Sequence, residues 1–131
     1  MSPQELPAKL AKLESDVASD RGDFVLFALF LREDVPDRWD LIVSAPWAVA
    51  DQKSALDYLV ARIKSDLGPE DLTLLSRIIF VDPADIAVQD LNRAINIEHG
   101  AVEVRDSNFF GLPIKHAYII TSKRPGILVS N

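Results

Sequence analysis

Two segments of this chain are apolar at both alternating positions of a β-strand, and this feature constrains the fold most. They are residues 24–31 and 76–81. Successive side chains of a strand point to opposite faces of the sheet, so a strand with one wet face alternates apolar and polar residues. A strand that is apolar at both positions needs cover above and below. The sequence therefore predicts a sheet whose two faces are both covered, by helices or by a second subunit.

Apolar residues at helical spacing predict three helices. The first has a stripe formed by Leu6, Leu10, Leu13 and Val17. In the second, Asp51 caps a helix that ends at Gly68-Pro69. Its apolar face comprises Leu56, Leu59, Val60, Ile63 and Leu67. The third begins with Asp82 as cap and Pro83 at the first helical position, and runs to about Asn96. We expect it to bury Ile86, Leu91, Ala94 and Ile95.

The strands are predicted to form two hairpins and one further strand. Residues 39–45 follow residues 24–31 after a turn at 32–38, and residues 76–81 come after a helix, so they can run parallel to 39–45. In the second hairpin, residues 107–111 connect a strand at 102–105 to one at 112–121. We expect Glu103 opposite Lys115, Val104 opposite Ile114 and Val102 opposite His116, which matches charge with charge. Residues 127–129 can add a short edge strand.

Together these elements predict one α/β domain of mixed α+β type, spanning residues 1–131. The expected order is α-β-β-α-β-α-β-β around a mixed sheet of about five strands. Its helices cover both faces, or one face while a dimer contact covers the other. A chain of 131 residues can bury a core without metal or disulfide support.

Composition excludes several classes of function. The chain has no cysteine, which excludes disulfides, thiolate metal sites and a cysteine nucleophile. Its net charge of −6 repels nucleic acid and anionic lipid, so we expect neither as a partner. The first residues do not form a signal peptide, and we expect a cytoplasmic protein. The five glycines are scattered singly and none opens a helix as a phosphate cradle, so we expect no nucleotide cofactor.

His116 is the first candidate for catalysis. It can act as an acid/base supported by Glu103 or Asp40, with Arg105 or Lys115 steering a small-molecule substrate. Its strand face is shared with Ile114, Tyr118 and Ile120, so the alternative is a core histidine with one satisfied hydrogen bond.

Two metal-dependent hypotheses are weaker. Glu103 and Arg105, with Asp82 or Asp40, resemble a distant form of the acidic cluster that holds Mg²⁺ in nucleases, although Arg105 cannot give up a proton in this role. Alternating charges on a wet strand face explain the same residues. His99 and His116 with a carboxylate could form a zinc site, but their spacing is not compact. His99 beside Gly100 is also typical of a turn, so no metal is predicted.

Three aromatic residues predict an interaction surface. Phe109 and Phe110 fall at a hairpin tip and Trp47 at the start of a loop, positions that are usually polar. Aromatic side chains exposed on loops mark association surfaces, although these rings could instead fold back over the ends of the sheet. The leading hypothesis is therefore a non-catalytic binding or assembly module that acts as a homo-oligomer, with a dimer as the simplest form and a protein partner as a further option.

Overall fold

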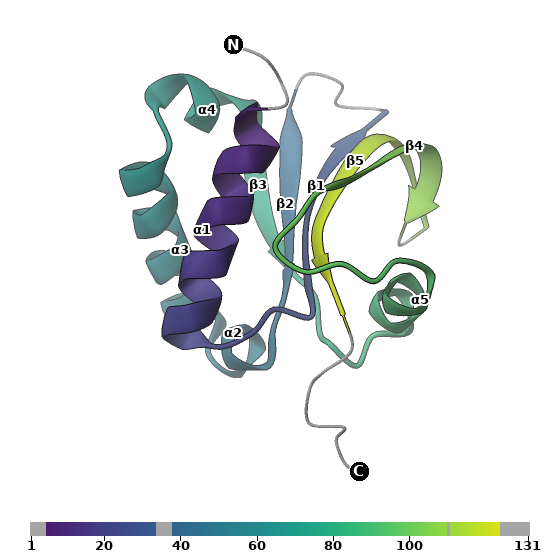
Figure 1. The fold of residues 1–131 in the computed structure, drawn as a ribbon, viewed down its shortest axis with the longest axis horizontal. Coiled ribbons are helices and arrows are strands. Elements are labelled where there is room, and N and C mark those ends of the chain that lie inside the picture. The colour runs from purple at the N-terminus through teal and green to yellow at the C-terminus, as the bar shows by residue number, and fades with distance from the viewer. Residues whose placement is uncertain (1–4, 34–37, 110, 124–131) are drawn as a thin grey trace.

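The computed structural model of the chain describes residues 5–33, 38–109 and 111–123. Its centre is a five-stranded sheet with the strand order β3-β2-β1-β5-β4 (Figure 1). Neighbours β2 and β3 are parallel, and the other neighbouring pairs are antiparallel. The predicted α/β class with a mixed sheet is confirmed.

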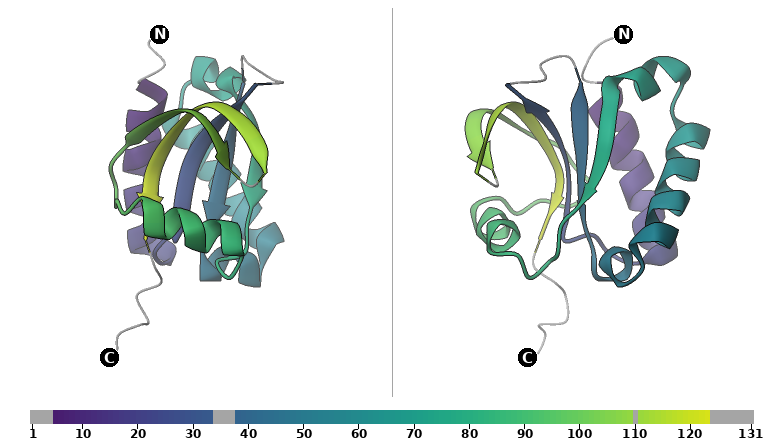
Figure 2. Two further views of the ribbon diagram at one scale, coloured as in Figure 1. Left: turned by 90° about the vertical axis from the view of Figure 1, so that its right-hand side faces the viewer. Right: turned by 180° about the vertical axis from the view of Figure 1, so that it is seen from behind.

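Helices cover both faces of this sheet. The strands are β1 (Leu26–Arg32), β2 (Trp39–Ser44), β3 (Leu75–Phe80), β4 (Val102–Phe109) and β5 (Leu112–Ser122). The helices are α1 (Glu5–Arg21), α2 (Pro46–Ala50), α3 (Gln52–Asp66), α4 (Pro69–Leu74) and α5 (Ile86–Ala94). Helices α1 to α4 lie on one face, and α5 lies on the other beneath the curled β4–β5 hairpin (Figure 2).

The two-sided burial of β1 follows from its sequence. Phe27 and Leu29 belong to the core under α1 to α4, whereas Leu26, Ala28 and Phe30 belong to the core under α5. All five side chains are buried, as the apolar residues at both alternating positions predicted. We call these two clusters the first core and the second core.

The apolar stripes predicted for α1 and α3 are confirmed for most of their residues. Leu6, Leu10, Leu13 and Val17 of α1 are all buried. The carboxylate of Asp51 accepts a hydrogen bond from the backbone N–H of Ser54, 3.2 Å away, and so caps α3. Leu56 of α3, however, is 39% exposed, and the residues of this stripe that enter the first core are Leu59, Ile63 and, just after the helix, Leu67.

Two short helices, α2 and α4, were not predicted. They have 5 and 6 residues, too few to show a helical period. Each begins with a proline, Pro46 or Pro69, and Pro69 was predicted only as part of the end of the preceding helix. Proline has the backbone angle of a first helical residue and lacks the N–H that would be unpaired there, so it also starts a helix.

The predicted start of the third helix was wrong. Helix α5 begins at Ile86, and Asp85 caps it by accepting a hydrogen bond from Ala87 N–H at 2.8 Å. Asp82 instead forms a turn, its carboxylate accepting from Ala84 N–H at 2.8 Å. This shift of the helix leaves Ile86 72% exposed and turns Val88, Leu91 and Asn92 toward the sheet. Ala94, also expected inside, is exposed.

The predicted register of the second hairpin was also wrong. Val104 lies opposite Ala117 and Val102 opposite Ile119, so the strands are displaced by three residues from the expected pairing. Strand β4 continues to Phe109, which pairs with Leu112. Residues 110 and 111 alone separate these partners, and Gly111 has a φ of +75°, which suits such a tight connection. Apolar packing, and not the charge match of Glu103 with Lys115, therefore decides the pairing.

An irregularity at Lys115 separates the ends of β5. Leu31 pairs with His116 and the next residue, Arg32, pairs with Ile114, so Lys115 is a bulge in the pairing of β5 with β1. Ile114 consequently belongs to the second core, whereas His116 contacts Trp39 and Tyr118 of the first core. The predicted edge strand at 127–129, Phe110 and much of the turn at 32–38 lie outside the described residues.

Candidate functional site

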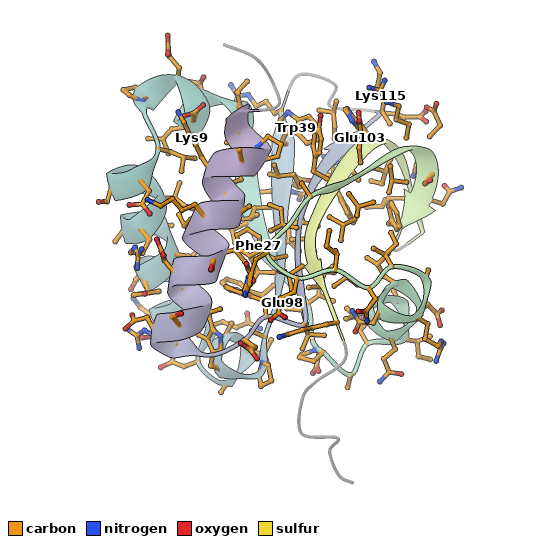
Figure 3. All side chains as sticks on the ribbon, viewed as in Figure 1. Lys9, Phe27, Trp39, Glu98, Glu103 and Lys115 are labelled. Carbon is orange, nitrogen blue, oxygen red and sulfur yellow. The ribbon has the colours of Figure 1, made fainter. Side chains whose placement is uncertain are left out.

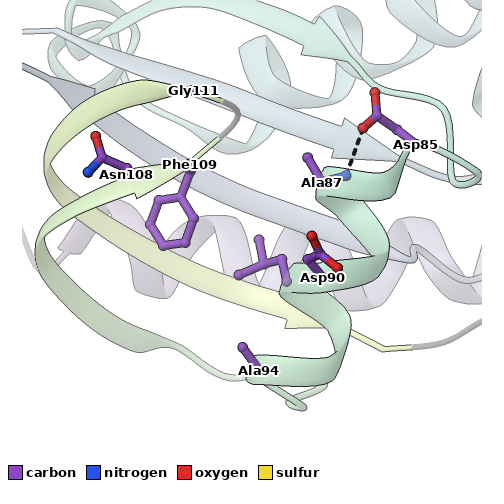
Figure 4. Close-up of a pocket in the computed structure, with 8 residues that line it drawn as sticks. Asp85, Ala87, Asp90, Ala94, Asn108, Phe109 and Gly111 are labelled. Atoms are coloured by element: carbon purple, nitrogen blue, oxygen red, sulfur yellow. Dashed lines mark hydrogen bonds between the residues drawn. The ribbon is translucent and has the colours of Figure 1, made fainter.

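A pocket of about 590 Å³ lies between α5 and the tip of the β4–β5 hairpin (Figure 4). We call it the α5–hairpin pocket. It is lined by Asp85, Ala87, Asp90, Leu91, Ala94, Asn108, Phe109 and Gly111. Its volume is within the range of sites that take a small molecule or a few side chains of a partner.

The hairpin wall of this pocket is positioned by aromatic packing. The Phe109 ring stacks on Phe30, with 5.0 Å between the ring centroids and 21° between the planes. Phe30 is buried in β1, so it provides a rigid support. Phe109 remains half-buried and points into the space that faces α5 (Figure 4).

The helical wall combines apolar side chains with two carboxylates. Leu91 is buried and Ala87 is half-buried, while Asp85 and Asp90 are exposed. Asp85 is held in place because it caps α5, and Asp90 forms an ion pair with Arg93 one turn along the helix. The pocket therefore has an apolar interior and a rim with two carboxylates, of which Asp90 is paired with Arg93 and Asp85 is not paired with a cation within the described residues.

Two exposed apolar side chains are close to the pocket along the chain. Of the large apolar side chains exposed among the described residues, Ile86 (72%) and Leu112 (42%) are sequence neighbours of residues that line it. The third, Leu56, is on α3 at the other face of the sheet. Exposed apolar surface next to a pocket is a feature of interaction sites.

The three predicted catalytic residues do come together, on the strands farthest from β3. Glu103 Oε2 lies 2.6 Å from His116 Nε2 and 2.7 Å from a terminal nitrogen of Arg105. Hydrogen bonds from Arg105 and then from His116 lower the pKa of the Glu103 carboxyl below its ordinary value. The His116 ring lies against Trp39 and Tyr118, at centroid distances of 5.5 and 4.7 Å.

The His116 cluster has the polar groups of an acid/base site, but none of its residues lines the α5–hairpin pocket. A catalytic imidazole needs a ring nitrogen within reach of a substrate, and Nε2 of His116 is engaged by Glu103. Burial raises the pKa of the neighbouring Tyr118 phenol, and the charge of Glu103 adds to this effect. The cluster is thus a set of hydrogen-bonded and aromatic side chains at one end of the first core.

Asp40, the other predicted support of His116, is not part of this cluster. It pairs with Phe30 across the strands and lies on the second-core face, opposite to His116. Its buried carboxylate is 3.2 Å from Arg77 Nε and 3.6 Å from Arg32 Nε. Of the two supports predicted for His116, Glu103 is therefore the one in contact, and Asp40 lies on the other face because neighbouring residues of β2 alternate between faces.

The residues of the two metal hypotheses are dispersed. Asp82 follows β3 and Glu103 is on β4, the two opposite edges of the sheet, which are about 19 Å apart at ~4.8 Å per strand. His99 bonds to Thr121, five residues along β5 from His116. Glu98 precedes His99 in the sequence and Glu103 contacts His116. These two glutamates lie at opposite ends of the sheet (Figure 3). Within the described part of the chain, no group of three His, Asp or Glu side chains could hold a metal ion.

Trp47 and Phe109 lie on opposite sides of the sheet, so one contact surface does not contain both. Trp47 is half-buried in the helical layer, with its indole N–H donating to the Gly22 carbonyl at 2.9 Å. It therefore folds back over the end of the sheet, the alternative that the sequence left open. Phe110 lies outside the described residues.

Sequence reasoning missed a buried polar cluster formed by Glu14, His99 and Thr121. Glu14 is fully buried on α1, and its carboxylate accepts hydrogen bonds from His99 Nδ1 at 2.5 Å and from Thr121 Oγ1 at 2.8 Å. A signal was present, since Glu14 follows Leu10 by four residues and precedes Val17 by three. A charged residue on an apolar helical stripe needs a partner from elsewhere in the fold.

None of the described helices has both the length and the apolar composition that crossing a bilayer requires. A comparison of the chain with known protein families, with curated proteins and with solved structures finds no match in any of the three.

Proposed function

We propose that this protein is a non-catalytic binding module, located in the cytoplasm, whose α5–hairpin pocket receives an apolar and cationic segment of a partner protein. One observation carries the proposal: the pocket is lined by direct sequence neighbours of Ile86 and Leu112, two exposed apolar side chains. Burying such side chains against a partner is favourable by about 25 cal/mol per Å² of apolar surface.

Charge favours a cationic partner over a second copy of this chain. The pocket rim carries Asp85 and Asp90, and the whole chain has a net charge of −6. Two copies that met through this surface would bring like charges together, which is unfavourable. The homo-oligomer expected from the sequence therefore stays a prediction, to be measured by light scattering of the purified protein.

Binding is better supported than acid/base chemistry at His116. The His116 cluster is fixed by Glu103, Trp39 and Tyr118, whereas the pocket has open volume beside apolar groups. A rigid wall such as Phe109 on Phe30 lowers the entropic cost of association, because fewer side chains need ordering.

The test uses a fluorescein-labelled amphipathic helix made of leucine and lysine, and a matched peptide of leucine and glutamate. We expect the lysine peptide to bind with saturable fluorescence anisotropy and the glutamate peptide to bind much more weakly. Ile86→Ala or Leu112→Ala should each weaken binding about tenfold, since each removes roughly 1.4 kcal/mol of apolar contact.

The control is Leu56→Ala, which removes an exposed apolar side chain of similar size from α3 on the other face. Circular dichroism should show that all three variants remain folded. Equal affinity of the two peptides, or an equal loss in Leu56→Ala, would contradict the proposal.

A further inference from the structure

A second pocket, of about 230 Å³, lies in the helical layer where the end of α1 meets α2 and α3. It is lined by Arg21, Trp47, Asp51, Ser54, Ala55 and Tyr58. It lies on the face of the sheet opposite to α5, so it is independent of the site proposed above. Two of its six lining residues are aromatic and two carry opposite charges.

The aromatic walls are held rigidly. The Trp47 ring packs edge-on against Phe24 at 5.6 Å and against Tyr58 at 6.5 Å, and its N–H is bound to Gly22. The Tyr58 hydroxyl donates to Asp20 at 2.6 Å and accepts from Arg62 at 3.2 Å. Neither ring can turn away without losing these contacts, so the walls are preorganised for a ligand.

The positive group of the pocket is Arg21. Its guanidinium lies 4.3 Å from the centroid of the Tyr58 ring, and its Nε is 3.9 Å from Asp20. Within the described residues, no hydrogen bond engages its terminal nitrogens. A guanidinium stacked on a ring in this way keeps its two terminal NH2 groups available for a carboxylate.

The negative group is Asp51. Its Oδ1 accepts from Ser54 N–H at 3.2 Å, a contact that caps α3 and fixes the orientation of the carboxylate. The side chain remains exposed, so the carboxylate can also accept a hydrogen bond from an ammonium group. The pocket therefore offers partners for both ends of a zwitterion.

We infer that this pocket binds a small zwitterion of the amino-acid class. The ligand carboxylate binds Arg21, its ammonium group binds Asp51, and its side chain lies against Trp47 and Tyr58. A volume of about 230 Å³ is that of a small site, which suits a single amino acid better than a folded peptide segment.

The test compares three molecules that differ in one group each: L-leucine, 4-methylpentanoate, which lacks the ammonium group, and 3-methylbutylamine, which lacks the carboxylate. Binding is followed by the indole N–H resonance of Trp47 in two-dimensional NMR, with the second tryptophan, Trp39, as an internal control. We expect a saturable shift with leucine at Trp47 and none at Trp39. Each single-charge analogue should bind at least about tenfold more weakly, a loss of ~1.4 kcal/mol.

Two charge variants locate the groups. Arg21→Gln and Asp51→Asn should each weaken leucine binding about tenfold. Asparagine caps a helix as well as aspartate does, so Asp51→Asn keeps α3 intact. The matched control is Asp57→Asn, which removes an exposed carboxylate from the same helix outside the pocket and should leave the affinity unchanged.

Three results would overturn the inference. They are the absence of a saturable shift at Trp47 in the unmodified protein, an affinity for the amine or the acid equal to that for leucine, and full binding by both Arg21→Gln and Asp51→Asn. The first two need no variant, so a variant that fails to fold does not affect them.

Discussion

Replacing His99 by alanine removes the imidazole that lies 2.5 Å from the fully buried carboxylate of Glu14. The remaining partner is the Thr121 hydroxyl, which donates one hydrogen bond at 2.8 Å. Leaving a buried polar group without a hydrogen-bond partner costs about 1–3 kcal/mol, and more when the group is a carboxylate. The His99 side chain is 38% exposed, so water can partly replace the imidazole and we expect a loss of about 2–3 kcal/mol.

Thermal unfolding followed by circular dichroism measures this loss. For a chain of this size, each 1 kcal/mol lowers Tm by roughly 4 °C, so His99→Ala should unfold about 10 °C below the unmodified protein. The cause is tested by a double-mutant cycle with Glu14→Gln, which removes the charge and keeps the shape. If the uncompensated carboxylate is responsible, His99→Ala should cost much less in the Glu14→Gln background.

Additivity of the two substitutions within about 0.5 kcal/mol would refute the reasoning. A loss below ~0.5 kcal/mol for His99→Ala alone would refute it as well, since surface substitutions without a special role fall in that range.

The other predictions concern Glu103 and Gly22. In Arg105→Gln, the lost hydrogen bond should raise the pKa of the Glu103 carboxyl toward its ordinary value in a ¹³C NMR titration. Because the pKa of Glu103 is lower in the folded protein than in the unfolded chain, ionised Glu103 stabilises the fold at a pH above its unfolded pKa. This stabilisation is lost as the pH falls through the folded pKa. An unchanged Glu103 titration in Arg105→Gln would contradict the prediction. Gly22→Ala should lower the free energy of unfolding by about 1–3 kcal/mol in urea, because φ is +129° and a Cβ would lie 3.1 Å from Trp47. Gly68→Ala is its control, since a Cβ there meets nothing within 4 Å and only the cap residue of α4 changes, and its effect should be smaller than that of Gly22→Ala.

Part of the candidate sites could be predicted from local sequence. The hairpin position of Phe109 and the short spacing of Glu103 and Arg105 placed these residues correctly near a hairpin end and on one strand. The contact of His116 with Glu103 was also foreseen as a pairing of acid/base groups. These interactions lie within one hairpin, where neighbours in space are close along the chain.

Other parts depend on long-range packing. The pocket beside α5 exists because β4 and β5 pair three residues away from the expected register and continue beyond β1, curling over α5 (Figure 2). The helical start at Ile86 instead of Asp82 decides which side chains of α5 face this pocket. Both choices are made by the fit of apolar side chains between elements, which local spacing does not encode.

The amino-acid sequence by itself determined the covered sheet, the buried stripe of α1 and the parallel entry of β3, because the periods of apolar residues select strand or helix and the number of buried faces. Only the tertiary structure decided that Glu14 would meet His99, 85 residues away, and that Trp47 and Phe109 would lie on opposite faces. The reason is physical: a period describes which side of an element is buried, whereas a partner across the core is chosen by the packing of all elements at once.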